Sequence, residues 1–323
     1  MKKEDLRIVF LGTPEFAVES LDRIVSEGYN VVGVVTMPDK PAGRGHHMLQ
    51  SDVKKYALAH SLPLLQPVNL KDPEFVAQLR ALNADLFIVI AFRMLPEVVW
   101  SMPPLGTFNL HASLLPRYRG AAPINRAVIN GDTVTGVTTF FLRHEIDTGD
   151  IISQQSISIG PDENVGSVHD RLMHLGADLT IDTIRHIIAG DLAPIPQESM
   201  LTPGEQPTPA PKIFKDTCRI DWNRTASELH NHIRGLSPYP AAWTTIDTTG
   251  DPASEPLQLK IFSARPTTRQ ATDPGRIVVE GNRMFIDAAD FALEILEVQL
   301  AGKRRMEVAP FLLGTKFPLT RTI

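Results

Sequence analysis

Short apolar runs and helically spaced apolar positions alternate from the start of the chain. Residues 6–11 (LRIVFL) form an apolar run, as expected of a buried parallel strand. Apolar positions between 17 and 25 then follow helical spacing, with Thr13-Pro14 as the start signal, Thr13 being the expected cap, and Gly28 as the stop. A second apolar run at 31–36 predicts the next strand, so that the whole segment reads as a βαβ unit.

The same alternation continues through the first two thirds of the sequence. It predicts helices at 51–60, 73–82, 122–130 and 165–189, and strands at 86–91, 106–110, 135–142 and 151–157. Helices and strands that alternate in this way indicate a doubly wound α/β domain. The turn after the first strand lacks G-x-G-x-x-G, so the pattern does not imply NAD or FAD.

A proline-rich stretch separates this part of the chain from a different pattern. Six prolines lie between 194 and 211, where fixed φ angles and missing N–H donors favour a semi-rigid linker outside the core. A helical patch follows at 226–234, and five short strands are expected at 242–246, 257–262, 276–279, 284–287 and 293–298. We therefore predict an α/β domain at 1–193, a linker at 194–211 and a small β-barrel domain at 212–323.

Composition and charge narrow the class of protein. The chain has 323 residues, of which 43% are hydrophobic and 21% charged, which is typical of globular domains. Cys218 is the only cysteine, so disulfides within the chain are excluded and a reducing, cytoplasmic location is expected. We expect neither a membrane-spanning segment nor a secretory signal. The net charge is −5, but Lys and Arg outnumber Asp and Glu by 15 to 13 from position 206 onward, a weak hint of a polyanionic partner.

The densest polar cluster follows the strand expected at 106–110. Asn109 and His111 are two residues apart, so their side chains should lie on one face near the carboxyl end of the strand, where α/β sheets bind ligands. An amide donor beside an imidazole suits acyl transfer, because both can stabilise an oxyanion and the imidazole can also carry a proton. Asp147 is a candidate partner for His111, although a purely structural hydrogen-bonding pair would give the same local pattern. No metal site is expected.

Several longer motifs resemble the 10-formyltetrahydrofolate-dependent formyltransferases. They are Gly12-Thr13-Pro14-Glu15-Phe16, Pro38-Asp39-Lys40-Pro41-Ala42-Gly43-Arg44-Gly45, Asn109-x-His111-x-Ser113-Leu114-Leu115-Pro116, Arg119-Gly120-Ala121-Ala122-Pro123, Asp147-Thr148-Gly149-Asp150, Arg219-Ile220-Asp221-Trp222 and Ser237-Pro238-Tyr239-Pro240-Ala241-Ala242-Trp243. The resemblance covers nearly the full chain. It implies a Rossmann-like formyltransferase domain followed by an OB-like β-barrel domain.

The resemblance also implies the roles of individual residues. The catalytic residues would be Asn109, His111 and Asp147, acting on 10-formyltetrahydrofolate as co-substrate without a metal. The folate-binding residues would be Ala91, Phe92, Ser113, Leu114, Leu115, Pro116, Leu142, Arg143, His144, Glu145 and Ile146. The chain departs from the family pattern at Arg93 and at 143–145, and both departures fall near the expected pterin pocket.

The acceptor amine is a separate question, and several acceptors remain open. Glycinamide ribonucleotide formyltransferases are commonly single domains, whereas amino-sugar formyltransferases and the hydrolase part of formyltetrahydrofolate dehydrogenase are nearer in length. The second domain and the Gly/Pro/basic insertion at 37–50 favour initiator Met-tRNA. The residues implied for tRNA binding are Lys40, Arg44, Lys303, Arg304 and Arg305. Two hypotheses from different functional classes are a non-catalytic folate- or RNA-binding relative and an NAD-linked oxidoreductase, the latter disfavoured by the missing glycine motif.

Overall fold

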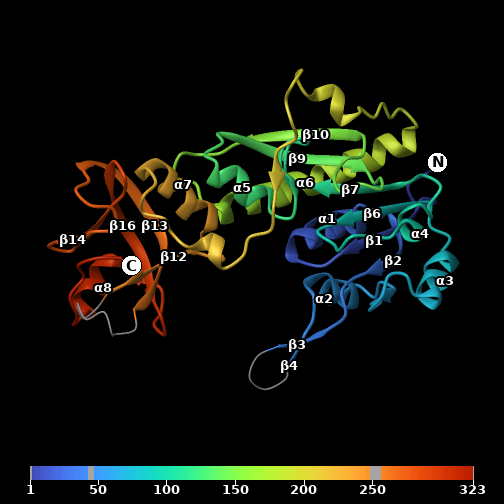
Figure 1. Cartoon of the computed structure of the whole chain (residues 1–323). Coiled ribbons are helices and arrows are strands. Elements are labelled where there is room, and N and C mark those ends of the chain that lie inside the picture. Colours follow the sequence, from blue (N-terminus) through green and yellow to red (C-terminus); the bar gives the residue numbers. More distant parts are fainter. Residues whose placement is uncertain (1, 43–46, 248–255, 323) are drawn as a thin grey trace. The chain divides into compact units, whose positions relative to one another are not determined.

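The computed structural model describes residues 2–42, 47–247 and 256–322, without the side chains of residues 42 and 47. These residues form two compact units, and each is described by itself (Figure 1). The first unit contains residues up to 120 together with 135–157 and 169–210. The second contains 121–134, 158–168 and the residues from 211 onward.

A seven-stranded sheet forms the centre of the first unit, in the order β10-β9-β7-β6-β1-β2-β5 (Figure 1). Its strands are β1 (Arg7–Gly12), β2 (Asn30–Val35), β5 (Leu64–Leu65), β6 (Leu86–Ile90), β7 (Thr107–His111), β9 (Val134–Phe141) and β10 (Ile151–Ser158). The β5, β2, β1, β6 and β7 strands pair in parallel, whereas β9 runs antiparallel to β7. Strand order reverses beside β1, as the predicted doubly wound fold requires.

Helices cover this sheet where the apolar spacing predicted them. They are α1 (Glu15–Ser26), α2 (Asp52–Ala59), α3 (Pro73–Ala81), α4 (Glu97–Trp100) and α6 (Val165–Ala189), of which α4 was not predicted. Alternate residues of β1 and β6, such as Val9 and Val89, pack against α3 and α4 in one apolar cluster. On β7, Leu110 points the other way and reaches Gly176 of α6, where a Cβ would lie 2.6 Å from its methyl group.

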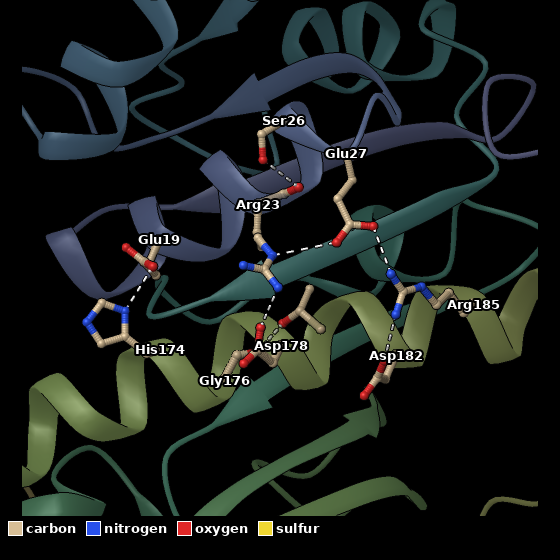
Figure 2. A network of polar contacts seen from close by, with 10 residues as sticks. Glu19, Arg23, Ser26, Glu27, His174, Gly176, Asp178, Asp182 and Arg185 are labelled. Carbon is tan, nitrogen blue, oxygen red and sulfur yellow. Dashed lines mark hydrogen bonds and ion pairs between the residues drawn. The ribbon is translucent and has the colours of Figure 1, made fainter.

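An ionic network joins α1 to α6 over the surface of this unit (Figure 2). Arg23 Nη2 lies 2.7 Å from Asp178 Oδ1, and Arg185 Nη2 lies 3.0 Å from Glu27 Oε2. Arg23, Asp178 and Arg185 are about half exposed and Glu27 is 27% exposed, so each pair contributes at most about 1 kcal/mol. The network therefore adds only modestly to the attachment of α1 to α6.

The start of α1 corrects one prediction from the sequence. Thr13 was expected to cap the helix, but Pro14 occupies the N-cap position and makes no side-chain cap. The Thr13 hydroxyl is buried and has no hydrogen-bond partner among the described residues. The predicted stop is confirmed, because Gly28 has a φ of +78° and donates its N–H to the Val25 carbonyl.

The second unit combines two packed helices with an antiparallel sheet. Its helices are α5 (Pro123–Ile129), α7 (Ala226–Leu236) and α8 (Val308–Gly314), and its strands are β12 (Ala242–Ile246), β13 (Leu257–Gln270), β14 (Ile277–Glu280), β15 (Arg283–Asp287), β16 (Phe291–Leu300) and β17 (Met306–Glu307). The sheet order is β12-β13-β16-β15-β14. Thr322 bridges the β12 edge and Arg321 bridges the residue before β14, so the C-terminal segment links both edges as in a barrel. The sequence missed α8 and the full length of β13.

Two short segments of the first unit also differ from the sequence analysis. The insertion at 37–50 contains an antiparallel ribbon, β3 (Lys40–Ala42) and β4 (His47–Leu49). The proline-rich stretch contains the 3-10 helix η1 (Gln197–Met200) and the short strand β11 (Pro209–Ala210). The β11 strand pairs in parallel with β8 (Arg119–Gly120). A second 3-10 helix, η2 (Asp216–Cys218), lies just beyond the stretch. Gln197 and Ala210 are completely buried. The expectation that this stretch stays outside the core is therefore wrong at these two residues.

No helix within the described residues is long and apolar enough to cross a membrane. Nor does that part of the chain contain a group of three or more His, Cys, Asp or Glu placed to hold a metal ion. Cys218 is buried, and burial raises the pKa of its thiol.

Candidate active site

Asn109 and His111 lie near the carboxyl end of β7, on one face of the sheet. Register places Asn109 beside Val89 of β6 and opposite Phe140 of β9, and neighbours in register project to the same side. Val89 packs on the side of α3 and α4, so Asn109 and His111 face that side as well. Asn109 is half-buried and His111 is 8% exposed. The predicted shared face is confirmed.

The His111 ring is oriented by a main-chain carbonyl. Its Nε2 lies 2.9 Å from the Tyr118 oxygen, and this oxygen can only accept, so Nε2 carries a proton and donates it. Tyr118 holds a φ of +64°, in the left-handed region, within the turn that presents the carbonyl. The other ring nitrogen, Nδ1, is therefore the one that can gain or lose a proton during chemistry.

Asp147 faces that second nitrogen. Its Oδ2 is 3.9 Å from His111 Nδ1, which is within ion-pair range and too long for a hydrogen bond. The same oxygen accepts the Gly120 N–H at 2.9 Å. Asp147 itself has a φ of +56°, and both side chains of the pair are at most 14% exposed. The loop thus holds a carboxylate within ion-pair distance of the imidazole.

A buried hydroxyl organises the loop that follows His111. Thr138 of β9 donates to the Ser113 carbonyl at 2.6 Å and accepts the Leu115 N–H at 3.1 Å. Gln154 of β10 donates to the same hydroxyl and to the Leu115 carbonyl, each at 2.8 Å. Ser113 is completely buried and donates to the Arg117 carbonyl at 2.6 Å. Leu115 and Pro116 are buried and joined by a cis peptide bond, while Leu114 is half-buried.

Besides the 113–116 loop, the residues predicted to bind folate come from two segments of the first unit, 91–92 and 142–146. Ala91 is exposed with a φ of +47°, and half-buried Phe92 packs against the apolar cluster below it. Leu142 packs against the same cluster. Ile146 is 59% exposed, so the second segment offers an apolar side chain to solvent or to a ligand.

Three of the four side chains that depart from the family pattern, those of Arg93, Arg143 and His144, have clear partners. Arg93 donates to the carbonyls of Pro67 and Val68, and burial lowers the pKa of its guanidinium. Arg143 pairs with Asp150. His144 lies 3.4 Å from Glu97 and packs edge-on against Trp100, whereas Glu145 is exposed. The two His144 contacts tie the 142–147 segment to α4.

An open cavity of 750 Å³ adjoins α4. It is lined in part by Arg93, Met94, Leu95, Pro96 and Glu97, which directly follow Ala91 and Phe92. Met94 is 71% exposed and Val68 is 82% exposed. Its lining combines apolar side chains with Asn69, Lys71, Arg93 and Glu97.

Residues predicted to bind tRNA fall in both units. Lys40 lies on β3. The residue before this strand, Asp39, pairs with Lys54 Nζ at 2.7 Å and accepts a hydrogen bond from Gln66 Nε2 at 3.0 Å. The Lys54 and then the Gln66 hydrogen bonds lower the pKa of Asp39. Arg44 lies outside the described residues.

The basic triplet lies after β16 in the second unit. Lys303 and Arg304 are exposed. Arg305 differs, because it pairs with Glu297 and stacks on the Phe262 ring at 4.2 Å. The Arg305 guanidinium therefore already contacts side chains of the protein itself.

Sequence reasoning missed several residues that shape the site. They are Tyr118, Thr138, Gln154 and Gln197, while Gly120 stood in a family motif without an assigned role. Thr138, Gln154 and Gln197 act through hydrogen bonds to residues at least 16 positions away, which no local pattern marks. Tyr118 acts through its main-chain carbonyl, which side-chain identity does not reveal.

Comparison with known proteins identifies the family. The model described as "Formyl transferase" matches residues 6–184, and the model described as "Formyl transferase, C-terminal domain" matches residues 212–316. This chain belongs to the formyl transferase family. The predicted fold, a Rossmann-like domain with a C-terminal domain, is confirmed by these two matches together with the sheet order.

Curated relatives agree with this membership, and solved structures share the fold. The methionyl-tRNA formyltransferase of Bacteroides fragilis is 58% identical over 97% of this chain and 96% of that relative. The one of Porphyromonas gingivalis is 48% identical over 97% of each. An N-formyltransferase from Helicobacter canadensis shares the fold with a TM-score of 0.64, at 18% identity over 93% of this chain and all of that one. HypX from Aquifex aeolicus shares it with a TM-score of 0.63, at 17% identity over 96% of this chain and 48% of that one.

Proposed function

We propose that this chain transfers the formyl group of 10-formyltetrahydrofolate to the α-amino group of methionine on initiator Met-tRNA. The observation that carries the proposal is the 58% identity, over nearly the whole of both chains, to relatives named for this activity. Both family domains match, so single-domain formyltransferases that act on smaller acceptors lose their support. The proposal puts the enzyme in the cytoplasm, where charged tRNA is used.

The arrangement around His111 supports direct transfer. The neutral acceptor amine attacks the formyl carbon, a C–N bond forms, and the carbonyl oxygen takes the negative charge. Asn109 and protonated His111 stabilise this oxyanion by hydrogen bonding and charge. The bond from the formyl carbon to the folate nitrogen then breaks, as a proton moves from the attacking amine to that nitrogen. No oxidation or reduction occurs, and no covalent intermediate with the protein is needed.

His111 and Asp147 divide the proton handling between them. Because His111 Nε2 donates to the Tyr118 carbonyl, Nδ1 is the nitrogen that exchanges the proton. A carboxylate 3.9 Å away stabilises the imidazolium by Coulomb attraction in a site where both side chains are largely buried. Asp147 also receives the Gly120 N–H, so its position is fixed before substrate arrives.

Two further surfaces belong to the proposal. Ala91, Phe92, Leu142 and Ile146 would form the walls for the folate, with the Ser113–Pro116 loop beside the reacting atoms. Lys40, Arg44 and the triplet at 303–305 would contact tRNA phosphates. Phosphate contacts of this kind weaken as salt rises.

The decisive experiment is formyl transfer from 10-formyltetrahydrofolate to charged initiator tRNA. Elongator Met-tRNA and uncharged initiator tRNA are the controls, and a nucleotide-linked amino sugar is the competing acceptor. The proposal predicts rapid product with the charged initiator alone. Transfer to the amino sugar, or release of free formate without any tRNA product, would overturn the choice of acceptor. Folate binding without transfer to any acceptor would support a non-catalytic role.

A further inference from the structure

Gln197 is a completely buried glutamine in the proline-rich stretch, and every group of its amide is used. Its Nε2 donates to the Asp147 carbonyl at 2.9 Å and to the Gly149 carbonyl at 2.8 Å. Its Oε1 accepts from Arg119 through Nε at 3.0 Å and Nη2 at 2.8 Å. A buried amide is costly unless it is paired in this way, so these four bonds account for its place in the core.

These bonds converge on a strained loop. Asp147 is not glycine, yet it holds a φ of +56°, which is a conformation that persists only when the surroundings enforce it. Two residues on, Gly149 approaches the Phe141 carbonyl so closely that a Cβ would overlap it. Gln197 is bonded to the main chain at both positions and thereby spans the turn that carries the Asp147 carboxylate.

Arg119 links the same glutamine to the other side of the carboxylate. It precedes Gly120, whose N–H donates to Asp147 Oδ2, so a ring of hydrogen bonds runs through Gln197, Arg119, Gly120 and Asp147. Gly120 has a φ of +128°, and a Cβ there would lie 2.6 Å from the Ala210 oxygen. Gln197 thus bonds the main chain of Asp147 directly and supports its side chain through Arg119 and Gly120.

The stretch is itself anchored on both sides of Gln197. Ile195 forms an antiparallel bridge with Ile151 at the start of β10. Thr208 accepts the Arg119 N–H at 2.9 Å, and β11 pairs with β8 directly after it. A segment that would otherwise only connect domains is therefore built into the site.

We propose that Gln197 is a positioning residue for the reaction, which holds the Asp147 carboxylate at its distance from His111. This inference rests on the proposed function, and it predicts an effect on turnover and none on substrate binding. Misplacing a reacting group by about 1 Å can cost about 100-fold in rate. Removing the Gln197 bonds is expected to lower kcat by about 10- to 100-fold.

The test uses the full chain with Gln197→Met, which keeps the volume and removes the amide. Expected results are a loss of kcat of about 10- to 100-fold and KM values for formyl-folate and Met-tRNA within about twofold of the original. In an Asp147→Ala background the same substitution should cost less than about twofold, because Gln197 acts through Asp147. Equal losses in both backgrounds, or an unchanged kcat, would overturn the proposal. Ser199→Ala, in the same turn and exposed, is the matched control and should leave kcat unchanged.

Two further measurements keep the result interpretable. If Gln197→Met fails to fold by circular dichroism, Arg119→Met removes the ring from its other side and should give the same non-additive loss. Amide hydrogen exchange over residues 143–150 tests positioning without any activity, and Gln197→Met should accelerate it. If amide exchange in Gln197→Met is unchanged, the inference is contradicted even when formyl transfer is confirmed. If the wild-type chain is inactive but exchange is faster in the variant, only the proposed function is contradicted.

Discussion

Replacing Glu294 by glutamine removes a buried negative charge from between two guanidinium groups of the second unit. Arg283 donates to Glu294 Oε1 at 2.7 Å and Arg265 donates to Oε2 at 2.6 Å. The Glu294 side chain is only 7% exposed, whereas its partners are 53% and 61% exposed. The hydrogen bond from Arg283, followed by that from Arg265, lowers the pKa of Glu294 from 4.5 to about 2.

The lowered pKa sets the size and the pH range of the effect. Since one pKa unit corresponds to about 1.4 kcal/mol, the shift corresponds to roughly 3 kcal/mol at neutral pH. Water around the half-exposed arginines screens the pairs, so we expect a loss of about 1–3 kcal/mol for Glu294→Gln. The folded-state pKa lies below the unfolded one. The contribution is therefore complete above about pH 4.5 and is lost as pH falls toward about 2.

Tryptophan fluorescence during urea unfolding measures this effect in the second unit. Trp222 and Trp243 lie in that unit, so a Trp100→Phe background removes the signal of the first. Glu280→Gln, which breaks an exposed pair with Arg269, is the matched control and should change the unfolding free energy by less than about 0.5 kcal/mol. A Glu294→Gln variant as stable as the control at pH 7, or a difference that does not shrink below pH 4.5, would refute the reasoning.

Three other predictions concern a glycine in the site, a buried histidine and two exposed cations. Gly149→Ala should lower both kcat and the melting temperature, since its Cβ would overlap a carbonyl oxygen of β9, while Gly314→Ala, which meets open space, should be neutral in the same assays. Burial lowers the pKa of His232 from 6.5 to about 4, so stability should fall by up to about 3 kcal/mol as pH drops from 6.5 toward 4. His232→Gln should flatten that slope in urea titrations, and an unchanged slope would exclude His232 as its source. Replacing Lys303 and Arg304 together by alanine should weaken tRNA binding measured by filter binding. The dependence of the binding constant on salt concentration should fall by about two phosphate contacts. An unchanged salt dependence would place the RNA elsewhere.

The longer elements of the α/β unit were predictable because each carries a local periodic pattern. Residues 31–36 and 86–91 were placed within one residue of β2 and β6, since buried parallel strands are continuous apolar runs. The Asn109 and His111 pair was also predictable, because period-2 geometry alone puts both side chains on one face. Local pattern was misleading at Thr13, where the following proline took the cap position.

The remaining features depend on contacts between residues far apart in sequence. Gln197 meets partners 50 and 78 residues away, and nothing in the sequence near it distinguishes it from a linker residue. The Tyr118 carbonyl that orients His111 depends on a main-chain turn, which side-chain identity does not specify. The β3 and β4 strands are three residues each and too short for a recognisable alternation.

Single-turnover formyl transfer by His111→Ala tests the central claim most directly. Wild type and variant would be compared with saturating 10-formyltetrahydrofolate and charged initiator tRNA, with folate binding measured in parallel by fluorescence. The account predicts a rate at least about 100-fold lower with folate affinity and fold retained, as expected for the loss of an oxyanion-stabilising group. A variant that retains nearly the full rate would show that the imidazole on β7 does not carry the chemistry.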